Sequence, residues 1–275
     1  MMIYIDAEQC TGCEVCIPAC PFAAIEMQEG KAVINENCTL CGACLDVCPM
    51  QAIVKTEEKE EKKEAVDKTR YRGVWIFAEQ RKGEIQSVTY ELLGEGRKLA
   101  NTRKQELCAV LLGHDMKDQA RELLHYGADK VYYMDDPVLE DFQDDPYSEC
   151  VKVLVNKYKP EILLCGATNI GRSFIPQVAV KLETGLTADC TGFDIDEESG
   201  NLLQTRPAFG GNIFATIATQ RHRPQIATVR HKVMKPALRS EKGEGEVIEE
   251  PVPDKARKPR TKIVDRFEEI EETVN

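Results

Sequence analysis

The chain has 275 residues, of which 30% are charged and 42% are hydrophobic, and its formal net charge is −11 at pH 7. This acidic balance argues against nucleic-acid binding, because a phosphate backbone requires a basic surface. The sequence has no apolar run long enough to span a bilayer, and its N-terminus lacks the basic segment and apolar core of a secretory signal. We therefore expect a cytoplasmic protein without a membrane span, and the length predicts about two domains.

Eight cysteines near the N-terminus form two copies of one spacing, C-x2-C-x2-C-x3-C-P, which begin at Cys10 and Cys38. This is the bacterial ferredoxin pattern, in which the fourth cysteine of each run serves the cluster of the other run. The spacing predicts a small α+β ferredoxin-like domain over residues 1–56 with two [4Fe-4S] clusters. The expected ligands are Cys10, Cys13, Cys16 and Cys48 for the first cluster, and Cys38, Cys41, Cys44 and Cys20 for the second.

A zinc site or a disulfide framework is the alternative interpretation of these cysteines, since paired cysteines two apart also suit tetrahedral zinc. Neither accounts for the third cysteine of each run or for the fourth, which stands before Pro21 and Pro49. The same segment carries seven acidic residues against Lys31 and Lys55. This charge favours docking to a basic patch on a redox partner.

Residues 57–72 contain six acidic and six basic residues and no glycine or proline. Such a run is typical of a solvated linker or a short exposed helix in which opposite charges lie close enough to pair. We expect it to tether the ferredoxin-like domain to a separate body. Mobility of the tethered domain is a further hypothesis.

Residues 73–240 alternate between short apolar runs and amphipathic stretches. Continuous apolar runs indicate strands of a parallel sheet that is covered on both faces. Strands are predicted at 74–79, 107–113, 130–134 and 161–167, and helices at 91–104, 118–127 and 145–160. This alternation predicts an α/β domain with a parallel sheet, in which ligands bind beyond the carboxyl ends of the strands.

Within residues 71–264 the sequence resembles the α subunit of electron-transfer flavoproteins. The stretches that carry the resemblance are ELLGEGRKLA (91–100), YGADKVY (126–132), GATNIGRSFIPQVAVKLETGLTADCTGFDID (166–196), TRPAFGGNIFATI (205–217) and RPQIATVR (223–230). A ferredoxin segment placed before this domain is similar to the α subunits of flavin-based electron-bifurcating complexes. The resemblance implies a β subunit and an acyl-CoA dehydrogenase-like partner, as in caffeyl-CoA reductase, or a lactate dehydrogenase-like partner.

The family's C-terminal FAD domain has a glycine-rich nucleotide-binding sequence that this chain lacks. We therefore expect residues 241–275 to be an extension with a last strand at 261–264, followed by the hinge to a domain outside this sequence. The GGN sequence at 210–212 lacks the strand and helix that flank a phosphate-binding loop. We assign it no nucleotide.

The resemblance implies that Arg172 approaches a second FAD, which the β subunit holds. A guanidinium beside the flavin ring would stabilise its anionic states. The alternative is a surface arginine that pairs with a nearby carboxylate. Four further positions, in expected loops, match the family's subunit interface or are structural turns: Thr187, Asp189, Phe209 and Gly210.

The remaining cysteines and the four histidines lack the spacing of a catalytic or metal site, so we assign no catalytic residue. We expect four of these cysteines to be small, buried hydrophobic residues: Cys108, Cys150, Cys165 and Cys190. We expect an electron-transfer subunit that relays single electrons between the β flavin and ferredoxin, in a complex that uses NADH. A non-bifurcating relay, and a ferredoxin segment that serves only docking or assembly, remain as alternatives.

Overall fold

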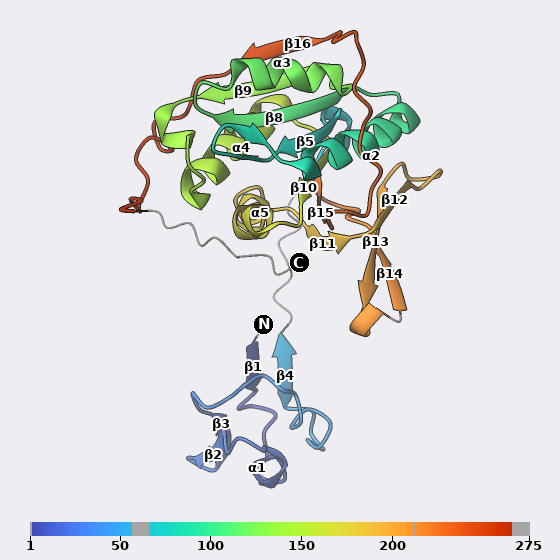
Figure 1. Ribbon diagram of the computed structural model, residues 1–275. Helices are drawn as coiled ribbons and strands as arrows, with labels where there is room; N and C mark the ends of the chain where they lie inside the picture. The colour runs from blue at the N-terminus through green and yellow to red at the C-terminus, as the bar shows by residue number, and fades with distance from the viewer. Residues whose placement is uncertain (1, 57–65, 212, 266–275) are drawn as a thin grey trace, which may run out of the picture. The chain divides into compact units, whose positions relative to one another are not determined.

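The computed structural model describes residues 2–56, 66–211 and 213–265. The chain divides into two compact units, residues 1–65 and residues 66–275 (Figure 1). Most of the expected charged linker at 57–72 lies outside the described residues. Its last part is described, and there Lys68–Arg70 forms the short 3-10 helix η1, in which Asp67 accepts a hydrogen bond from the backbone N–H of Thr69.

The N-terminal unit is a small α+β fold built from two antiparallel strand pairs and one helical turn. Its elements are β1 (Met2–Ile5), α1 (Cys16–Ala19), β2 (Ile25–Gln28), β3 (Lys31–Ile34) and β4 (Ile53–Thr56). Strand β1 pairs with β4, and β2 pairs with β3. The turn between β2 and β3 contains Glu29 and Gly30, both at positive φ, which is the backbone of a tight hairpin.

The core of this unit is small and contains sulfur. Its buried residues are Ile3, Cys10, Cys16, Ile25, Ala32, Cys44, Ala52 and Ile53. Three of these eight are cysteines from the two repeated runs. The unit therefore depends on its cysteine sites for much of its interior, as expected for so short a chain.

The larger unit has a seven-stranded sheet in the order β11-β15-β10-β5-β8-β9-β16, and every strand pair in it is parallel. The strands are β5 (Val74–Ala78), β8 (Leu107–Gly113), β9 (Lys130–Asp135), β10 (Ile162–Gly166), β11 (Leu186–Cys190), β15 (Gln225–Val229) and β16 (Glu246–Glu249). Every residue of β5, β8, β10 and β15 is buried. The predicted parallel α/β sheet is therefore confirmed.

Helices cover both faces of this sheet and divide the core into two clusters. The helices are α2 (Ser87–Arg103), α3 (Lys117–His125), α4 (Asp144–Tyr158) and α5 (Asn169–Lys181). One cluster includes Leu92 of α2 and Leu123 of α3, and the other includes Leu154 of α4 and Phe174 of α5. Within the described residues, no helix combines the length and apolar character that crossing a membrane requires.

Shorter elements complete the larger unit. They include the hairpin of β6 (Gln80–Arg81) and β7 (Glu84–Ile85) and the 3-10 helix η2 (Pro137–Leu139). A separate antiparallel sheet consists of β12 (Gly192–Ile195), β13 (Leu202–Ala208) and β14 (Ile213–Ile217). The 3-10 helix η3 (Phe209–Gly211) follows β13. Strand β14 presents Ile213 and Phe214 to solvent, with 56% and 64% of their surface exposed. We call β13, η3 and β14 the arm.

The prediction of a last strand at 261–264 is wrong, because residues 261–265 have no regular structure. Val264 is 91% exposed, so no apolar surface stabilises an extended segment there. The last strand of the described chain is instead β16, which pairs with β9 at the edge of the sheet. After β16, Arg257 contacts Asp136 and Arg260 contacts Asp145, and these ion pairs fasten the chain to the domain surface.

A single carboxylate holds the loop after β15 against α2. Both oxygens of Glu91 accept backbone hydrogen bonds, from the N–H of Lys232 at 2.9 Å and from Val233 and Met234 at 3.1 Å. Glu91 is buried, and three aligned N–H donors stabilise its charge.

We predict that Glu91→Gln lowers the free energy of unfolding by about 1–3 kcal/mol, because an amide turns an NH2 group toward donors that need an acceptor. Thermal unfolding of the full chain measures this loss. The control is Glu84→Gln at an exposed position in β7, which should unfold like the unsubstituted protein. Equal stability of the two variants would contradict the assigned role of Glu91.

Candidate functional site

Four cysteines of the N-terminal unit line one cavity, which we call site I. They are Cys10, Cys13, Cys16 and Cys48. The remaining wall includes the apolar side chains of Ile5, Met50 and Ile53. Cys10 and Cys16 are buried, whereas Cys13 is exposed, so one side of site I faces solvent.

The other four cysteines of the two runs line a second cavity, which we call site II. They are Cys20, Cys38, Cys41 and Cys44. Its wall is also apolar and includes Ile3, Phe22 and Ile25. These two groups of four are the two ligand sets expected from the sequence, with the fourth cysteine of each run in the cavity of the other run.

Helix α1 distributes its two cysteines between the cavities. Cys16 begins the helix and lines site I, whereas Cys20 is its C-cap and lines site II. The backbone leaves the helix at Cys20, where φ is −87° and ψ is 109°. The two sulfurs can therefore serve different cavities although only one helical turn separates them.

Backbone N–H groups point at one sulfur of each site. Ala32 donates to Sγ of Cys10 at 3.5 Å, and Ala24 donates to Sγ of Cys20 at 3.3 Å. The hydrogen bond from Ala32 is the main reason that the pKa of Cys10 is lowered, whereas burial raises the pKa of Cys16. Hydrogen bonds to sulfur stabilise a thiolate, which is the form that binds iron.

Gly12 lets the first cysteine loop approach the β2–β3 turn. Its φ is +71°, and a Cβ at this position would lie 2.3 Å from the backbone oxygen of Gly30. Any other residue would force the two segments apart. The donor sets fit iron–sulfur clusters, because each site offers four free thiols, apolar walls and an N–H directed at sulfur.

In the larger unit, Arg172 and Asp189 lie together. Arg172 Nη2 donates to Asp189 Oδ1 at 2.7 Å, and its Nε donates to the backbone oxygen of Ala167 at 3.0 Å. Arg172 is in the first turn of α5, and its side chain remains 56% exposed. The local carboxylate partner considered from the sequence is therefore present, and more than half of the side-chain surface of Arg172 still faces solvent.

Thr187 and Asp189 are in strand β11, so their expected placement in loops is wrong. The strand is irregular there, because its register with β15 shifts between Thr187 and Cys190 and Asp189 has φ +60°. The Asp189 N–H donates to Thr228 Oγ1 at 3.0 Å. Phe209 and Gly210 lie in η3 of the arm, and Gly210 has φ +74°.

Sequence reasoning missed a buried carboxylate where the strand order reverses, beside the ends of β5 and β10. Glu79 follows β5, is 1% exposed, and accepts a hydrogen bond from the hydroxyl of Thr168, which is the N-cap of α5. Burial raises the pKa of Glu79 although this hydrogen bond and the nearby Arg81 act to lower it. The acidic end of the VWIFAE run was the only signal in the sequence.

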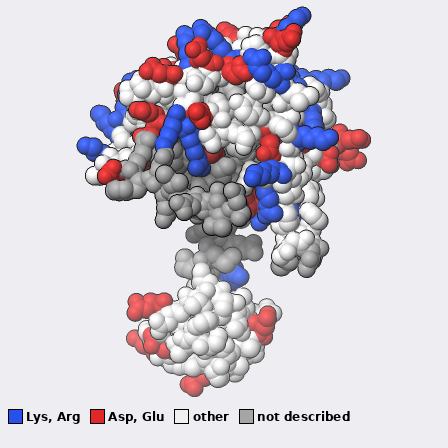
Figure 2. All heavy atoms as spheres, in the orientation of Figure 1, with Lys and Arg blue, Asp and Glu red and all other residues white. Residues whose placement is uncertain are grey.

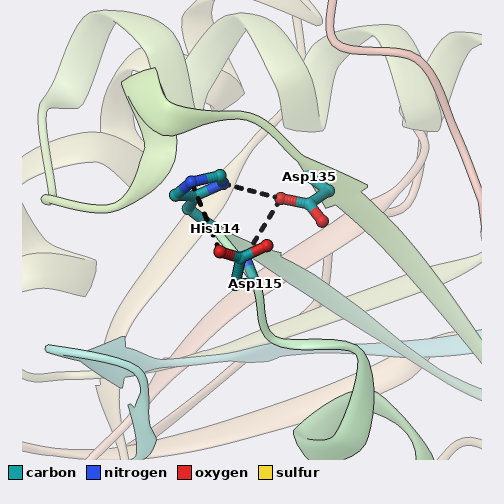
Figure 3. Close-up of side chains that lie close together, drawn as sticks. All are labelled: His114, Asp115 and Asp135. Carbon is teal, nitrogen blue, oxygen red and sulfur yellow. Dashed lines mark hydrogen bonds and ion pairs between the residues drawn. The ribbon is translucent and has the colours of Figure 1, made fainter.

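His114, Asp115 and Asp135 meet at the carboxyl ends of β8 and β9 (Figure 3). His114 Nδ1 lies 3.0 Å from Asp135 Oδ1, and the Asp115 N–H donates to the same oxygen at 3.1 Å. The hydrogen bond with Asp135 raises the pKa of His114. Partial burial acts to raise the pKa of Asp135, but its hydrogen bonds outweigh burial and lower that pKa. Because the groups satisfy one another at an exposed position, we assign them no ion.

Family profiles match both units. The profile of the electron transfer flavoprotein domain matches residues 74–255. Two profiles described as 4Fe-4S dicluster domains match residues 2–49 and 37–88. The first of these covers all eight cysteines of sites I and II.

Two of the curated relatives similar to this chain are electron transfer flavoprotein α subunits. The electron transfer flavoprotein subunit alpha of Thermoanaerobacterium thermosaccharolyticum is 47% identical over 205 residues, which cover 74% of this chain and 62% of the relative. The subunit of the same name from Clostridium acetobutylicum is 54% identical over 165 residues, 60% of this chain and 49% of the relative. The lactate dehydrogenase (NAD(+),ferredoxin) subunit LctC of Acetobacterium woodii is 46% identical over 174 residues, 63% of this chain and 41% of the relative. The chain thus spans about half the length of these relatives.

The His114–Asp135 pair predicts a pH dependence. A raised pKa of His114 means that its contribution to stability is full below the ordinary histidine pKa and is lost as pH rises through the raised value. The lowered pKa of Asp135 means that the pair is also lost in strong acid. We expect His114→Gln to reduce the Tm more at about pH 5.5 than at about pH 8.5. A Tm difference independent of pH, or one matched by the control His222→Gln, would exclude this pair.

Proposed function

This chain belongs to the electron transfer flavoprotein family, as an α-type subunit with iron–sulfur domains, and we propose that it relays single electrons through two [4Fe-4S] clusters. The observation that carries the proposal is the grouping of eight cysteines into two cavities of four. Bound clusters would supply one-electron redox chemistry without protons.

The residues of the N-terminal unit have distinct tasks in this proposal. Cysteine thiolates bind iron, and the apolar side chains around them limit water access, which lowers the local dielectric constant. The N–H groups of Ala32 and Ala24 place positive dipoles against the sulfurs of Cys10 and Cys20. Such dipoles favour the more negative, reduced state.

The larger unit provides the surface for a flavin-bearing β subunit. Arg172 is fixed by Asp189 and Ala167 but is half exposed, so it can add a charge-assisted hydrogen bond to a flavin that a partner holds. The exposed apolar side chains of Ile213 and Phe214 make the arm a second candidate contact, which would include Phe209 and Gly210. Thr187, in the same irregular strand as Asp189, belongs to the proposed interface as well.

We place the subunit in an electron-bifurcating complex. Support comes from relatives whose names include a lactate dehydrogenase that uses NAD(+) and ferredoxin and an acryloyl-CoA reductase electron transfer subunit, the latter 44% identical over 195 residues. NADH would reduce the β flavin, one electron would pass to ferredoxin, and the other would pass to an acyl-CoA dehydrogenase-like or lactate dehydrogenase-like partner. A cytoplasmic location is part of this proposal, because reduced thiols require a reducing compartment.

An acidic surface on the N-terminal unit supports docking of a redox partner with basic side chains. In Figure 2, acidic side chains lie at the left, right and lower margins of the visible face of this unit. The exposed side chains of Phe22 and Met50, which also line sites II and I, supply apolar patches next to the proposed clusters. This surface is compatible with electron exchange and with a docking role alone.

Metal analysis of the full chain, purified without oxygen, tests the cluster assignment. We expect about eight irons and eight acid-labile sulfides per chain, and two reducible S = 1/2 centres by EPR. Because the fourth ligand crosses over, Cys20→Ser and Cys38→Ser should perturb the same EPR centre, while Cys48→Ser perturbs the other. Cys108→Ala, in a buried strand of the larger unit, is the control that should leave both centres unchanged. Zinc without a reducible centre would refute the proposal.

Arg172→Ala tests the flavin contact in the complex with a β subunit. Loss of one charge-assisted hydrogen bond should lower NADH-driven ferredoxin reduction by roughly tenfold or more, while the iron content and its EPR signals stay constant. The matched control is Arg239→Ala, which removes a half-exposed arginine paired with Glu122. Equal ferredoxin reduction by both variants would remove Arg172 from the mechanism.

A further inference from the structure

Lys31 places a positive charge beside site I. It is the first residue of β3, directly after the Gly30 turn, and its Nζ donates a hydrogen bond to the backbone oxygen of Cys10. The residue is half-buried rather than fully exposed. The hydrogen bond therefore holds the ammonium group next to the first cysteine of site I, where water screens it less than at an open surface.

The repeat places an apolar residue at the matching position of site II. When Cys10 is aligned with Cys38, Lys31 corresponds to Ile3, because each stands seven residues before the first cysteine of a run. Ile3 is buried and lines site II. The two halves of the unit therefore present a cation to one site and a hydrocarbon side chain to the other.

The other hydrogen-bond donors and charged side chains differ less between the two sites. Backbone N–H groups donate to sulfur in both sites, for example from Ala32 to Cys10 in site I and from Ala24 to Cys20 in site II. Glu14 lines site I and acts in the opposite sense to Lys31, but its side chain is exposed and water screens it. Lys55 lies opposite Ile3 in the β1–β4 ladder, and it too is exposed.

We propose that Lys31 makes site I the higher-potential site of the pair, so that the first electron to enter the N-terminal unit resides there. This inference rests on the proposed function, because it presumes a [4Fe-4S] cluster in each site. One electron from a reduced flavin adds one negative charge and neither makes nor breaks a bond. The fixed ammonium of Lys31 stabilises that charge at site I by direct Coulomb attraction. Site II, walled by Ile3, lacks this contribution.

The difference between the two sites sets the order in which they accept electrons. A single electron shared between the sites spends most of its time at site I, and site II fills only when a second electron arrives or when the donor is strongly reducing. Lys31 acts through its charge near site I, which determines at which site the electron resides. It is therefore a positioning residue and touches no substrate.

The test is an EPR-monitored potentiometric titration of the full chain with both clusters in place, using dithionite as reductant. The variants are Lys31→Met, Glu14→Gln and Lys55→Met, each of which removes one charge and keeps most of the side-chain volume. We expect two reduction steps in the unsubstituted chain. In Lys31→Met the higher step should move down and the lower step should stay, so the ratio of the two reduction constants falls by roughly three- to thirtyfold. Glu14→Gln should move the higher step slightly up, and Lys55→Met should move neither.

Several results would overturn the inference. They are an unchanged pair of steps in Lys31→Met, an equal shift of both, or a fall of the lower step alone. The last outcome would mean that Lys31 acts on the site that is reduced second. A shift as large in Lys55→Met would show that any lysine of the unit has this effect. Failure of the proposed function looks different, since chains without reducible clusters show no steps in any variant.

Discussion

The crossed grouping of the cysteines is the constraint on which the N-terminal unit depends. Each cysteine run contributes three thiols to one cavity and one thiol to the other, and α1 connects the two cavities through Cys16 and Cys20. The apolar residues of this unit are too few to form a large core, and buried cysteines complete it. The arrangement of the cysteines is therefore coupled to the folding of this unit, as in other small proteins whose metal sites replace a hydrophobic interior.

The larger unit is stabilised by the packing of apolar side chains between its sheet and its helices. Its central strands are covered by α2 and α3 on one face and by α4 and α5 on the other. This packing fixes the carboxyl ends of the strands, where Glu79, Thr168, Arg172 and Asp189 form hydrogen bonds between segments distant in the sequence. A rigid sheet thus supplies an edge of defined charge, at which these side chains are held in fixed positions.

The sequence was most informative where one local pattern controlled the structure. Continuous apolar runs predicted the ends of β5, β8, β9 and β10 to within about one residue, because parallel strands buried on both faces are apolar at most positions. The cysteine spacing predicted which four thiols share each cavity, since the reach of the chain between ligands is short.

Prediction failed where distant segments decide the outcome. Strand β16 has only four residues and forms because it can pair with β9 at the edge of the sheet. Residues 261–264 remain exposed to solvent and form no strand. The contact of Glu79 with Thr168 joins residues 89 apart, and that of His114 with Asp135 joins residues 21 apart. The local periodicity of the sequence does not indicate contacts between residues so far apart. The irregular backbone at Asp189 likewise depends on pairing with β15.

The two outer strands of the large sheet determine how this chain can associate with other molecules. On one side β16 covers β9 and is followed by proline at positions 251 and 253, which cannot donate ladder hydrogen bonds. On the other side the bulge in β11 interrupts the row of free N–H and C=O groups. Neither border offers a long, flat template for a further strand. Edge-to-edge stacking of large sheets from neighbouring copies into fibres is thus disfavoured at both borders.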